Sequence, residues 1–248
     1  MKHAPLGQNF LKNLYYVDMM IKSLDLKPYD NLVEIGAGEG AITLKLIKLL
    51  GEEKLCKVVT YEIDKTLSNK FLNISAKGFT ILNESFLNSK FESLFSSYKV
   101  IGSIPYYITS PIIHNLLGVQ NKPTKICLMV QYEIAQKLLS KAPKSTYWSY
   151  VTYNYSVKKI AKVESKYFNP KPKVDSAIVL FEKNKMDDNF EFDKYSWFLH
   201  KIYKYPRKKL RNYVNREALE ASHIDGNYRS QNLTFQNIKD LWQNGLSP

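Results

Sequence analysis

The sequence is poor in cysteine and has no long apolar run. Cys56 and Cys127 are the only cysteines among 248 residues, so a disulfide framework is not expected. No apolar stretch approaches the roughly 20 residues of a membrane-spanning helix. The first residues, Met1 to Pro5, lack the apolar core of a secretory signal. We therefore expect a globular protein that acts in the cytoplasm without a membrane.

The sequence also lacks the residue clusters that bind metal ions or activate a nucleophile. Its four histidines are scattered, with no cysteines or carboxylates at zinc-ligand spacing around them. It shows no nucleophile–base arrangement, no internal repeat and no low-complexity tract. These absences argue against a metalloenzyme and against covalent catalysis.

Acidic residues are scarce relative to basic ones. The chain has 36 Lys and Arg against 23 Asp and Glu, a net charge of +13, and a pI near 9.4. Such an excess favours a polyanionic partner, with nucleic acid first and an anionic membrane surface second. A lysine-rich proteome would give the same total, so the placement of the charges has to decide.

Short apolar runs alternate with helical patterns along the first part of the chain. This alternation predicts a mostly parallel sheet flanked by helices, that is, an α/β fold. The predicted strands are 31–35, 57–62, 79–83, 98–102 and 125–130, and the predicted helices are 15–24, 41–50, 65–73, 111–117 and 132–139. Two later β-rich runs, 147–157 and 176–182, can pair as antiparallel strands at one sheet edge.

The pattern changes near Lys183. Beyond it, polar helical segments carry interleaved basic and aromatic residues. We therefore predict a larger α/β domain of residues 1–183 and a small helical C-terminal domain of residues 184–248.

A glycine-rich turn follows the first predicted strand of the sheet. Gly36, Gly38 and Gly40 permit a tight turn and close approach of a ligand to the backbone. Their G-x-G-x-G spacing does not match the dinucleotide fingerprint, which makes NAD the weaker interpretation. Glu62, at the end of the next strand, can accept hydrogen bonds from both hydroxyls of a ribose. Together these features favour an adenosine-type cofactor without a pyrophosphate, which is S-adenosylmethionine.

A second motif, Ser103-Ile104-Pro105-Tyr106, ends the predicted strand at 98–102. The serine side chain and the backbone carbonyls can accept hydrogen bonds from an exocyclic amine, and proline offers no competing donor. The tyrosine ring can stack on a base, a contact worth roughly 1–3 kcal/mol. The motif therefore predicts chemistry on a nucleobase nitrogen.

These motifs resemble those of the KsgA and Erm ribosomal RNA adenine N6-dimethyltransferases. Gly7–Leu11 resembles their N-terminal cofactor-covering motif, and Glu34–Gly40 and Glu62–Asp64 resemble their first two cofactor motifs. Ser103–Ser110 resembles their catalytic motif, and Phe168–Ser176 resembles their late F-x-P-x-P-K-V-[DN]-S motif. The resemblance covers most of the chain and implies a class I methyltransferase, Rossmann-like sheet with a small helical C-terminal domain.

The resemblance also assigns roles to individual residues. The implied cofactor-binding residues are Gln8, Asn9, Leu11, Glu34, Gly36, Gly38, Gly40, Glu62, Ile63, Glu84, Ser85 and Ser103. The implied catalytic residues are Ser103, Ile104, Pro105, Tyr106 and Phe168. Glu34 either contacts the cofactor or only orients the glycine loop. Phe168 is either a second aromatic beside the target base or a packing residue under the proline-rich loop.

Two positions depart from the family pattern. Where the family has an aspartate for the adenine amine of the cofactor, this chain has Ser85, with Glu84 one residue earlier. Ser103 stands in place of the usual catalytic asparagine, and its side chain is shorter. These departures put full activity in doubt, and a loop closure or a bridging water would be needed to compensate at Ser103.

A basic segment near the C-terminal end resembles one in the KsgA branch. Arg207, Lys208, Lys209 and Arg211 can neutralise several RNA phosphates, and Lys171 and Lys173 could add contacts near the active-site mouth. A solvated helix face is the alternative interpretation of the segment.

The function expected from the sequence is methylation of adenine N6 in ribosomal RNA, most simply in the small subunit and by a monomer bound to RNA or to a pre-ribosomal subunit. The alternatives are an Erm-like large-subunit enzyme that confers antibiotic resistance, and a weak or inactive factor that binds S-adenosylmethionine and RNA in ribosome assembly or transcription. A DNA adenine methyltransferase is disfavoured by the late proline-rich motif and the basic segment.

Overall fold

The computed structural model describes residues 7–52, 54–139, 155–184 and 192–245. Their contacts divide the chain into two compact units, one formed by Met1–Ala135 and Val157–Lys183 and the other by Gln136–Ser156 and Asn184–Pro248. Each unit is described by itself. Within the described residues, no helix is long and apolar enough to cross a membrane.

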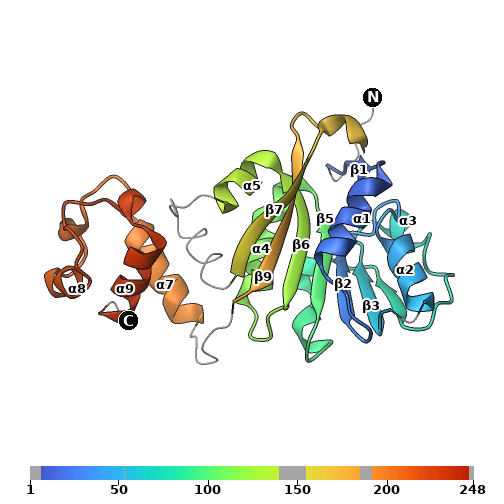
Figure 1. The fold of residues 1–248 in the computed structure, drawn as a ribbon, viewed down its shortest axis with the longest axis horizontal. Helices are drawn as coiled ribbons and strands as arrows, with labels where there is room; N and C mark the ends of the chain where they lie inside the picture. The colour runs from blue at the N-terminus through green and yellow to red at the C-terminus, as the bar shows by residue number, and fades with distance from the viewer. Residues whose placement is uncertain (1–6, 53, 140–154, 185–191, 246–248) are drawn as a thin grey trace. The chain divides into compact units, whose positions relative to one another are not determined.

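The first unit is built on a seven-stranded sheet (Figure 1). The strand order is β4-β3-β2-β5-β6-β9-β7, in which β2 to β6 run parallel and β9 runs antiparallel to β6. The strands are β2 (Asn31–Ile35), β3 (Lys57–Tyr61), β4 (Phe79–Leu82), β5 (Lys99–Ser103), β6 (Lys125–Gln131), β7 (Tyr155–Val163) and β9 (Ser176–Lys183). A separate two-stranded sheet pairs β1 (Phe10–Leu11) with β8 (Phe168–Asn169).

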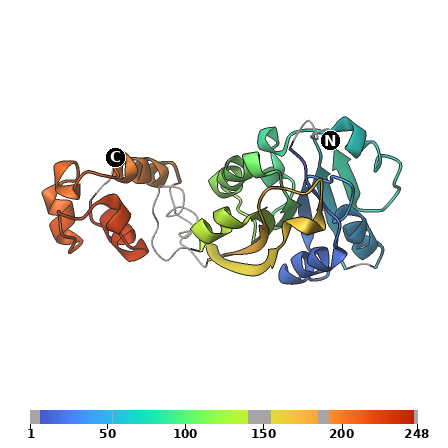
Figure 2. The same cartoon turned by 90° about the horizontal axis from the view of Figure 1, so that it is seen from above.

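Helices cover both faces of the large sheet, which explains why its central strands are apolar throughout. They are α1 (Leu14–Ser23), α2 (Thr43–Gly51), α3 (Lys65–Ser68), α4 (Thr109–Gly118) and α5 (Tyr132–Leu138), with short 3₁₀ turns η1 (Phe86–Asn88), η2 (Phe91–Ser93), η3 (Tyr106–Ile108) and η4 (Ser165–Tyr167). The blue α1 and the green α4 lie on opposite sides of the sheet in Figure 2.

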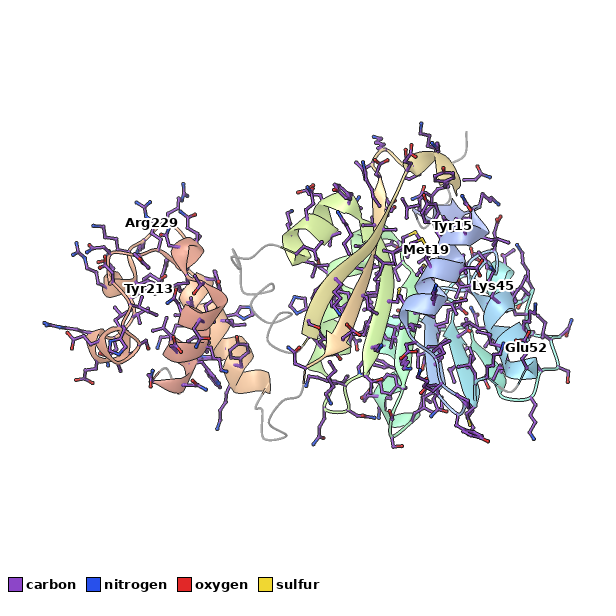
Figure 3. The ribbon with its side chains drawn as sticks, in the orientation of Figure 1. Tyr15, Met19, Lys45, Glu52, Tyr213 and Arg229 are labelled. Atoms are coloured by element: carbon purple, nitrogen blue, oxygen red, sulfur yellow. The ribbon has the colours of Figure 1, made fainter. Side chains whose placement is uncertain are left out.

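Side chains of α1 and α2 pack on one sheet face. Val17 and Met20 of α1 and Leu46 of α2 lie in one cluster with alternate residues of β2, β5, β6 and β9. Lys45 of α2 pairs with Asp18 at the surface of this layer, near Met19 and Tyr15 (Figure 3). The cluster fixes α1 and α2 on this face, and α2 begins at Thr43, just after the glycine turn that follows β2.

The second unit contains α7 (Phe192–Tyr203), α8 (Arg216–Ala221) and α9 (Phe235–Gln243), with turns η5 (Leu210–Asn212) and η6 (Ser230–Asn232). Its core includes the rings of Tyr195, Phe198 and Trp242, whose centroids lie 5.3 to 5.8 Å apart. Aromatic burial of this kind stabilises a helical unit of modest size.

Most elements agree with the sequence-based prediction to within a residue or two, and the α/β fold class is confirmed. Two ranges are wrong. The helix predicted over 65–73 ends at Ser68, because the following backbone makes i→i−3 turns that carry Phe71 under the glycine loop. The strand predicted over 147–157 is β7, Tyr155–Val163; residues 147–154 lie outside the described residues. Its second half was missed because this edge strand carries exposed lysines, as edge strands commonly do.

Candidate functional site

The site lies where the strand order of the large sheet reverses. The chain proceeds from β2 outward to β3 and β4, and then returns to the other side of β2 with β5 and β6. The loops that follow β2 and β5 therefore diverge, and such a switch point leaves a crevice at the carboxyl ends of the strands.

A cavity occupies this crevice. It is lined by residues of seven segments that lie apart in the sequence: Gln8, Asn9, Phe10, Ile35, Gly36, Gly38, Tyr61, Glu62, Ile63, Glu84, Ser85, Phe86, Leu87, Ser103, Ile104, Pro105, Tyr106, Tyr107, Ile108, Ile112, Met129 and Phe168. The structure thus brings the glycine turn, the end of β3 and the Ser103–Tyr106 loop to a single cavity.

The glycine turn needs its glycines for conformation and for space. Gly36, Gly38 and Gly40 all have positive φ angles, of 80°, 54° and 92°. A Cβ atom at Gly40 would lie 2.8 Å from the Phe71 ring. Gly36 and Gly38 form part of the cavity wall, whereas Gly40 does not line the cavity. The absence of a side chain at Gly40 lets the turn pack closely over Phe71.

Glu62 holds the glycine turn from the neighbouring strand. Its side chain is almost fully buried, and its two carboxylate oxygens accept hydrogen bonds from the backbone N–H groups of Gly38 (2.8 Å) and Asp64 (2.9 Å). The Asn83 side-chain amide donates to the backbone carbonyl of Glu62 at 2.8 Å. A carboxylate fixed in this way on a cavity wall has lone pairs left to accept hydroxyl hydrogens of a ligand.

Glu34 faces away from the cavity. It is fully buried, and it accepts hydrogen bonds from the hydroxyls of Thr43 (2.9 Å) on α2 and Thr60 (2.8 Å) on β3. The period-2 geometry of β2 puts Glu34 on the same side as Leu32, toward α2. Of the two roles left open by the sequence, the contacts fit support of the loop rather than contact with a cofactor.

Burial raises the pKa of Glu34 to about 7, although the hydrogen bonds from Thr60 and Thr43 oppose this shift and the nearby charge of Glu62 adds to it. In the unfolded chain the pKa is close to 4.5. In the folded protein Glu34 keeps its proton to a higher pH than in the unfolded chain. Its contribution to the free energy of unfolding is therefore complete below pH 4.5 and is lost as the pH rises through 7.

Glu34→Gln is expected to remove this pH dependence. Relative to the variant, the wild-type protein should lose about 2–3 kcal/mol of unfolding free energy between pH 4.5 and pH 8. Denaturant unfolding of both proteins across this range measures the difference, since the other titrating groups cancel in the subtraction. Parallel curves would contradict the raised pKa.

The N-terminal segment closes one side of the cavity. β1 pairs with β8, so that Leu11 lies opposite Phe168, and the backbone N–H of Lys12 donates to Tyr167 at 2.8 Å. Gln8 and Asn9 line the main cavity, and Leu11 lines a smaller one beside it that shares Asn9. An ion pair between Lys12 and Glu39 ties the segment to the glycine turn.

The Ser103–Tyr106 loop forms the opposite wall. The Ser103 hydroxyl lies 3.9 Å from the sulfur of Met129, and the Tyr106 hydroxyl lies 2.7 Å from that of Ser176. Phe168, almost fully buried, lines the same cavity. Phe168 also packs in the hydrophobic cluster with Leu11 and Val163, so its placement is compatible with both interpretations, a packing residue and an aromatic beside the base.

The remaining positions predicted from the cofactor motifs also lie at the cavity. Ile63, Glu84 and Ser85 line it; Glu84 is exposed and Ser85 is half-buried at the start of η1, where its side chain makes no capping bond. Both candidate acceptors that follow β4 thus line the cavity.

Sequence reasoning missed several cavity residues, among them Phe10, Tyr61, Tyr107 and Met129. Phe10 lies inside the N-terminal motif and could have been found there. The others have no local signal, because apolar residues on strands and turns look the same whether they meet a ligand or the core.

The predicted RNA-binding residues fall into the two units. Lys171 and Lys173 are exposed on the loop between β8 and β9. In the smaller unit, the backbone of the Arg207–Arg211 segment pairs with residues 226–229, through Leu210 N–H to Tyr228 (2.7 Å) and a bridge between Lys209 and Arg229. Arg229, labelled in Figure 3, is exposed and thus adds a cation beside this segment. The segment is a paired loop leading into η5 and not an α-helix face.

No group of three or more potential metal ligands occurs within the described part of the chain. The site is therefore interpreted from its carboxylate, its glycine turn and its aromatic wall.

The chain is similar to known proteins over almost its whole length. Residues 1–243 match the family model described as "Ribosomal RNA adenine dimethylase". "Ribosomal RNA small subunit methyltransferase A" of Mesomycoplasma hyopneumoniae strain 232 is 35% identical over 260 residues, with 97% of this chain and 96% of the relative covered. The protein of the same name in Mycoplasma mobile is 36% identical over 237 residues, with 93% and 89% covered.

Two solved structures share the fold over almost the whole chain. A dimethyladenosine transferase from Plasmodium falciparum has a TM-score of 0.80 at 24% identity, with 94% of this chain and 95% of that chain covered. The 23S rRNA methyltransferase ErmE has a TM-score of 0.76 at 23% identity, with 95% and 99% covered. At these identities the likeness concerns the fold alone.

Proposed function

Because the chain belongs to the ribosomal RNA adenine dimethylase family, we propose that it transfers methyl groups from S-adenosylmethionine to adenine N6 in small-subunit ribosomal RNA. One observation carries the proposal: the carboxylate of Glu62 and the aromatic rings of Tyr106 and Phe168 line one cavity. A single cavity can then hold an adenosine cofactor at one end and a nucleobase at the other.

The residues at the first end fit the cofactor. Glu62 is placed to accept the ribose hydroxyls, and the turn at Gly36 and Gly38 leaves room for close approach. Gln8, Asn9 and Leu11 would cover the cofactor, Ile63 would pack on its adenine, and Glu84 or Ser85 would accept from its amine. Gly40 and Glu34 are assigned to the support of the turn.

The other end would hold the base that receives the methyl group. The bound cofactor supplies an electrophilic methyl carbon on a sulfonium. Adenine N6 is a weak nucleophile because its lone pair delocalises into the ring, so the site has to act mainly by positioning. The Ser103 hydroxyl and the Ile104 backbone carbonyl would accept hydrogen bonds from the amine and stabilise the positive charge that develops on N6. Pro105 restricts the backbone of the loop that carries these acceptors.

The aromatic side chains of Tyr106 and Phe168 would stack on a base that has left its RNA stack. Transfer would form the bond from N6 to the methyl carbon and break the carbon–sulfur bond, so that S-adenosylhomocysteine leaves and the N6 proton passes to water. No base on the protein is required before transfer.

Mass spectrometry of RNA tests the proposal. Purified protein, S-adenosylmethionine and small ribosomal subunits lacking N6-methyladenine should yield methylated adenine, with large subunits as the control for an Erm-like specificity. Cofactor binding without any methyladenine would instead support the inactive assembly factor, the alternative that the serine at 103 raises. We propose that the protein acts as a monomer in the cytoplasm, where its ribosomal partner is assembled.

Ser103→Asn is expected to raise kcat by about fivefold, because the longer side chain carries its acceptor oxygen closer to N6 and strengthens one hydrogen bond. Single-turnover methylation of small subunits measures the change, and Ser103→Ala, which loses the acceptor, should be slower than the wild-type protein. If Ser103→Asn is slower too, the loop beside Met129 is already fitted to serine.

Arg207, Lys208, Lys209 and Arg211 are proposed to bind phosphates, with Lys171 and Lys173 on the larger unit. Arg207→Ala and Arg211→Ala should each lower the slope of log K against log salt by about 0.7–0.9 for every phosphate that is no longer neutralised. Fluorescence anisotropy with a ribosomal RNA fragment measures the slopes. Arg216→Ala is the matched control, since Arg216 is exposed but pairs with Glu220 at 2.7 Å. Equal slopes for all variants would mean that the segment is a solvated surface.

A further inference from the structure

The hydroxyl of Tyr106 is held by a residue that no cofactor or base motif assigns to catalysis. Ser176 is fully buried as the first residue of β9, and its Oγ lies 2.7 Å from the Tyr106 hydroxyl. The hydrogen bond joins the loop after β5 to the late motif, 70 residues further along the chain.

Ser176 sits on a rigid support. β9 pairs with β6 in register from Lys125–Glu182 to Gln131–Ser176, so Ser176 is the last paired residue of a long ladder. The preceding residue, Asp175, accepts the Tyr132 N–H through its backbone carbonyl (3.0 Å) and the Ser165 N–H through its carboxylate (3.0 Å). Lys162 pairs with the same carboxylate at 2.9 Å.

Tyr106 has much weaker support of its own. It begins the three-residue turn η3, which has no side-chain cap. The local backbone hydrogen bonds of η3, from the Ile108 N–H to the Pro105 carbonyl and from the Thr109 N–H to the Tyr106 carbonyl, hold the backbone and not the ring. Its ring is half-buried at the cavity wall. Burial raises the pKa of the Tyr106 hydroxyl from its ordinary value, and either hydroxyl of the Tyr106–Ser176 pair can be the donor. The direction of the ring therefore depends on the partner of its hydroxyl.

We propose that Ser176 is a positioning residue: it fixes the Tyr106 ring in the orientation that holds the target adenine with N6 toward the methyl donor. The inference rests on the proposed methylation of adenine. A ring anchored at both Cα and hydroxyl loses little freedom when a base stacks on it, and such preorganisation acts on the chemical step. Asp175 contributes by fixing the backbone on which Ser176 stands.

A double-mutant cycle tests the proposal. Ser176→Ala and Tyr106→Phe each remove one end of the hydrogen bond, and both keep an aromatic ring at position 106. Each should lower kcat by about tenfold, the effect of one lost hydrogen bond in a positioned site, with the dissociation constant of S-adenosylmethionine unchanged. Because both variants remove the same interaction, the double variant should also lose only about tenfold. A product of the two effects, about a hundredfold, would overturn the proposal.

Two further variants separate positioning from general loss of structure. Ser176→Thr keeps a hydroxyl on a strand and should recover most of kcat. Ser222→Ala is the matched control, because Ser222 is buried and its Oγ has no hydrogen-bond partner within the described residues. It should match the wild-type protein in kcat.

A readout without turnover keeps this inference separate from the proposed function. In protein with isotope-labelled tyrosine rings, the Tyr106 resonance, assigned through Tyr106→Phe, should show a clearly lower ring order parameter in Ser176→Ala. An unchanged order parameter would overturn the positioning role even in an active enzyme. A wild-type protein that fails to methylate RNA but shows the change in ring order would overturn the proposed reaction and leave the anchor intact.

Discussion

Glu62→Gln is expected to weaken binding of S-adenosylmethionine by about 100-fold, the effect of losing charge-assisted hydrogen bonds to two hydroxyls. The substitution also disturbs the site itself. Both carboxylate oxygens of Glu62 accept from backbone N–H groups, at Gly38 and Asp64. An amide NH₂ facing a backbone N–H cannot accept, so one of these bonds is lost and the glycine turn loosens.

Isothermal titration with S-adenosylmethionine measures the effect, and Glu34→Gln is its matched control. Glu34 is equally buried at the end of the neighbouring strand, but its partners are the hydroxyls of Thr43 and Thr60. A hydroxyl can rotate to accept from an amide, so Glu34→Gln should bind the cofactor almost as the wild-type protein does. Equal losses in both variants would show that the cofactor does not use Glu62 directly.

Tyr106→Ala is expected to lower kcat/KM for ribosomal RNA by about 30- to 100-fold, because a stacking contact with the target base is worth roughly 1–3 kcal/mol. Apart from Ser103, the residues assigned to the cofactor lie on other segments, so binding of S-adenosylmethionine should change by less than about twofold, the change expected for a residue that does not touch this ligand. Methylation kinetics and calorimetry on the same preparation measure the two quantities.

The control for this variant is Tyr29→Asn. Tyr29 is 82% exposed and precedes β2, so it lies at the amino ends of the strands, opposite the site. Asparagine tolerates its left-handed backbone, with φ of 72°. The control should keep full activity, and a loss below about threefold for Tyr106→Ala, less than the weakest expected stack, would contradict the stacking role.

Much of the sheet could be predicted from local pattern. The near-continuous apolar runs of β2 and β6 and the glycines after β2 carry their meaning within a few residues. The failures at α3 and β7 have a different cause. The backbone leaves the helix after Ser68 and places Phe71 beneath the glycine turn. β7 accommodates exposed lysines because it is an edge strand. Neither the end of α3 nor the extent of β7 can be predicted from hydrophobic periodicity.

For the candidate site, the sequence motifs identify individual residues but not the residues that they contact. Glu62 and Ser103 are predicted from their positions at the ends of strands. The direction of the Glu34 side chain, toward α2 and away from the cavity, depends instead on which sheet face α2 covers. The pairing of β1 with β8 likewise joins segments at opposite ends of the first unit's sequence.

The sequence alone determined the class of this protein, because hydrophobic period, turn chemistry and motif order are local properties of the chain. It determined an α/β sheet, a glycine turn for an adenosine cofactor and an aromatic loop for a base. Only the tertiary structure decided how these parts meet. The return of the chain across β2 forms the cavity, and the β6–β9 ladder carries Ser176 to Tyr106. Contacts between distant segments follow from strand order and from the face on which each side chain lies, and both are set by packing of the whole unit.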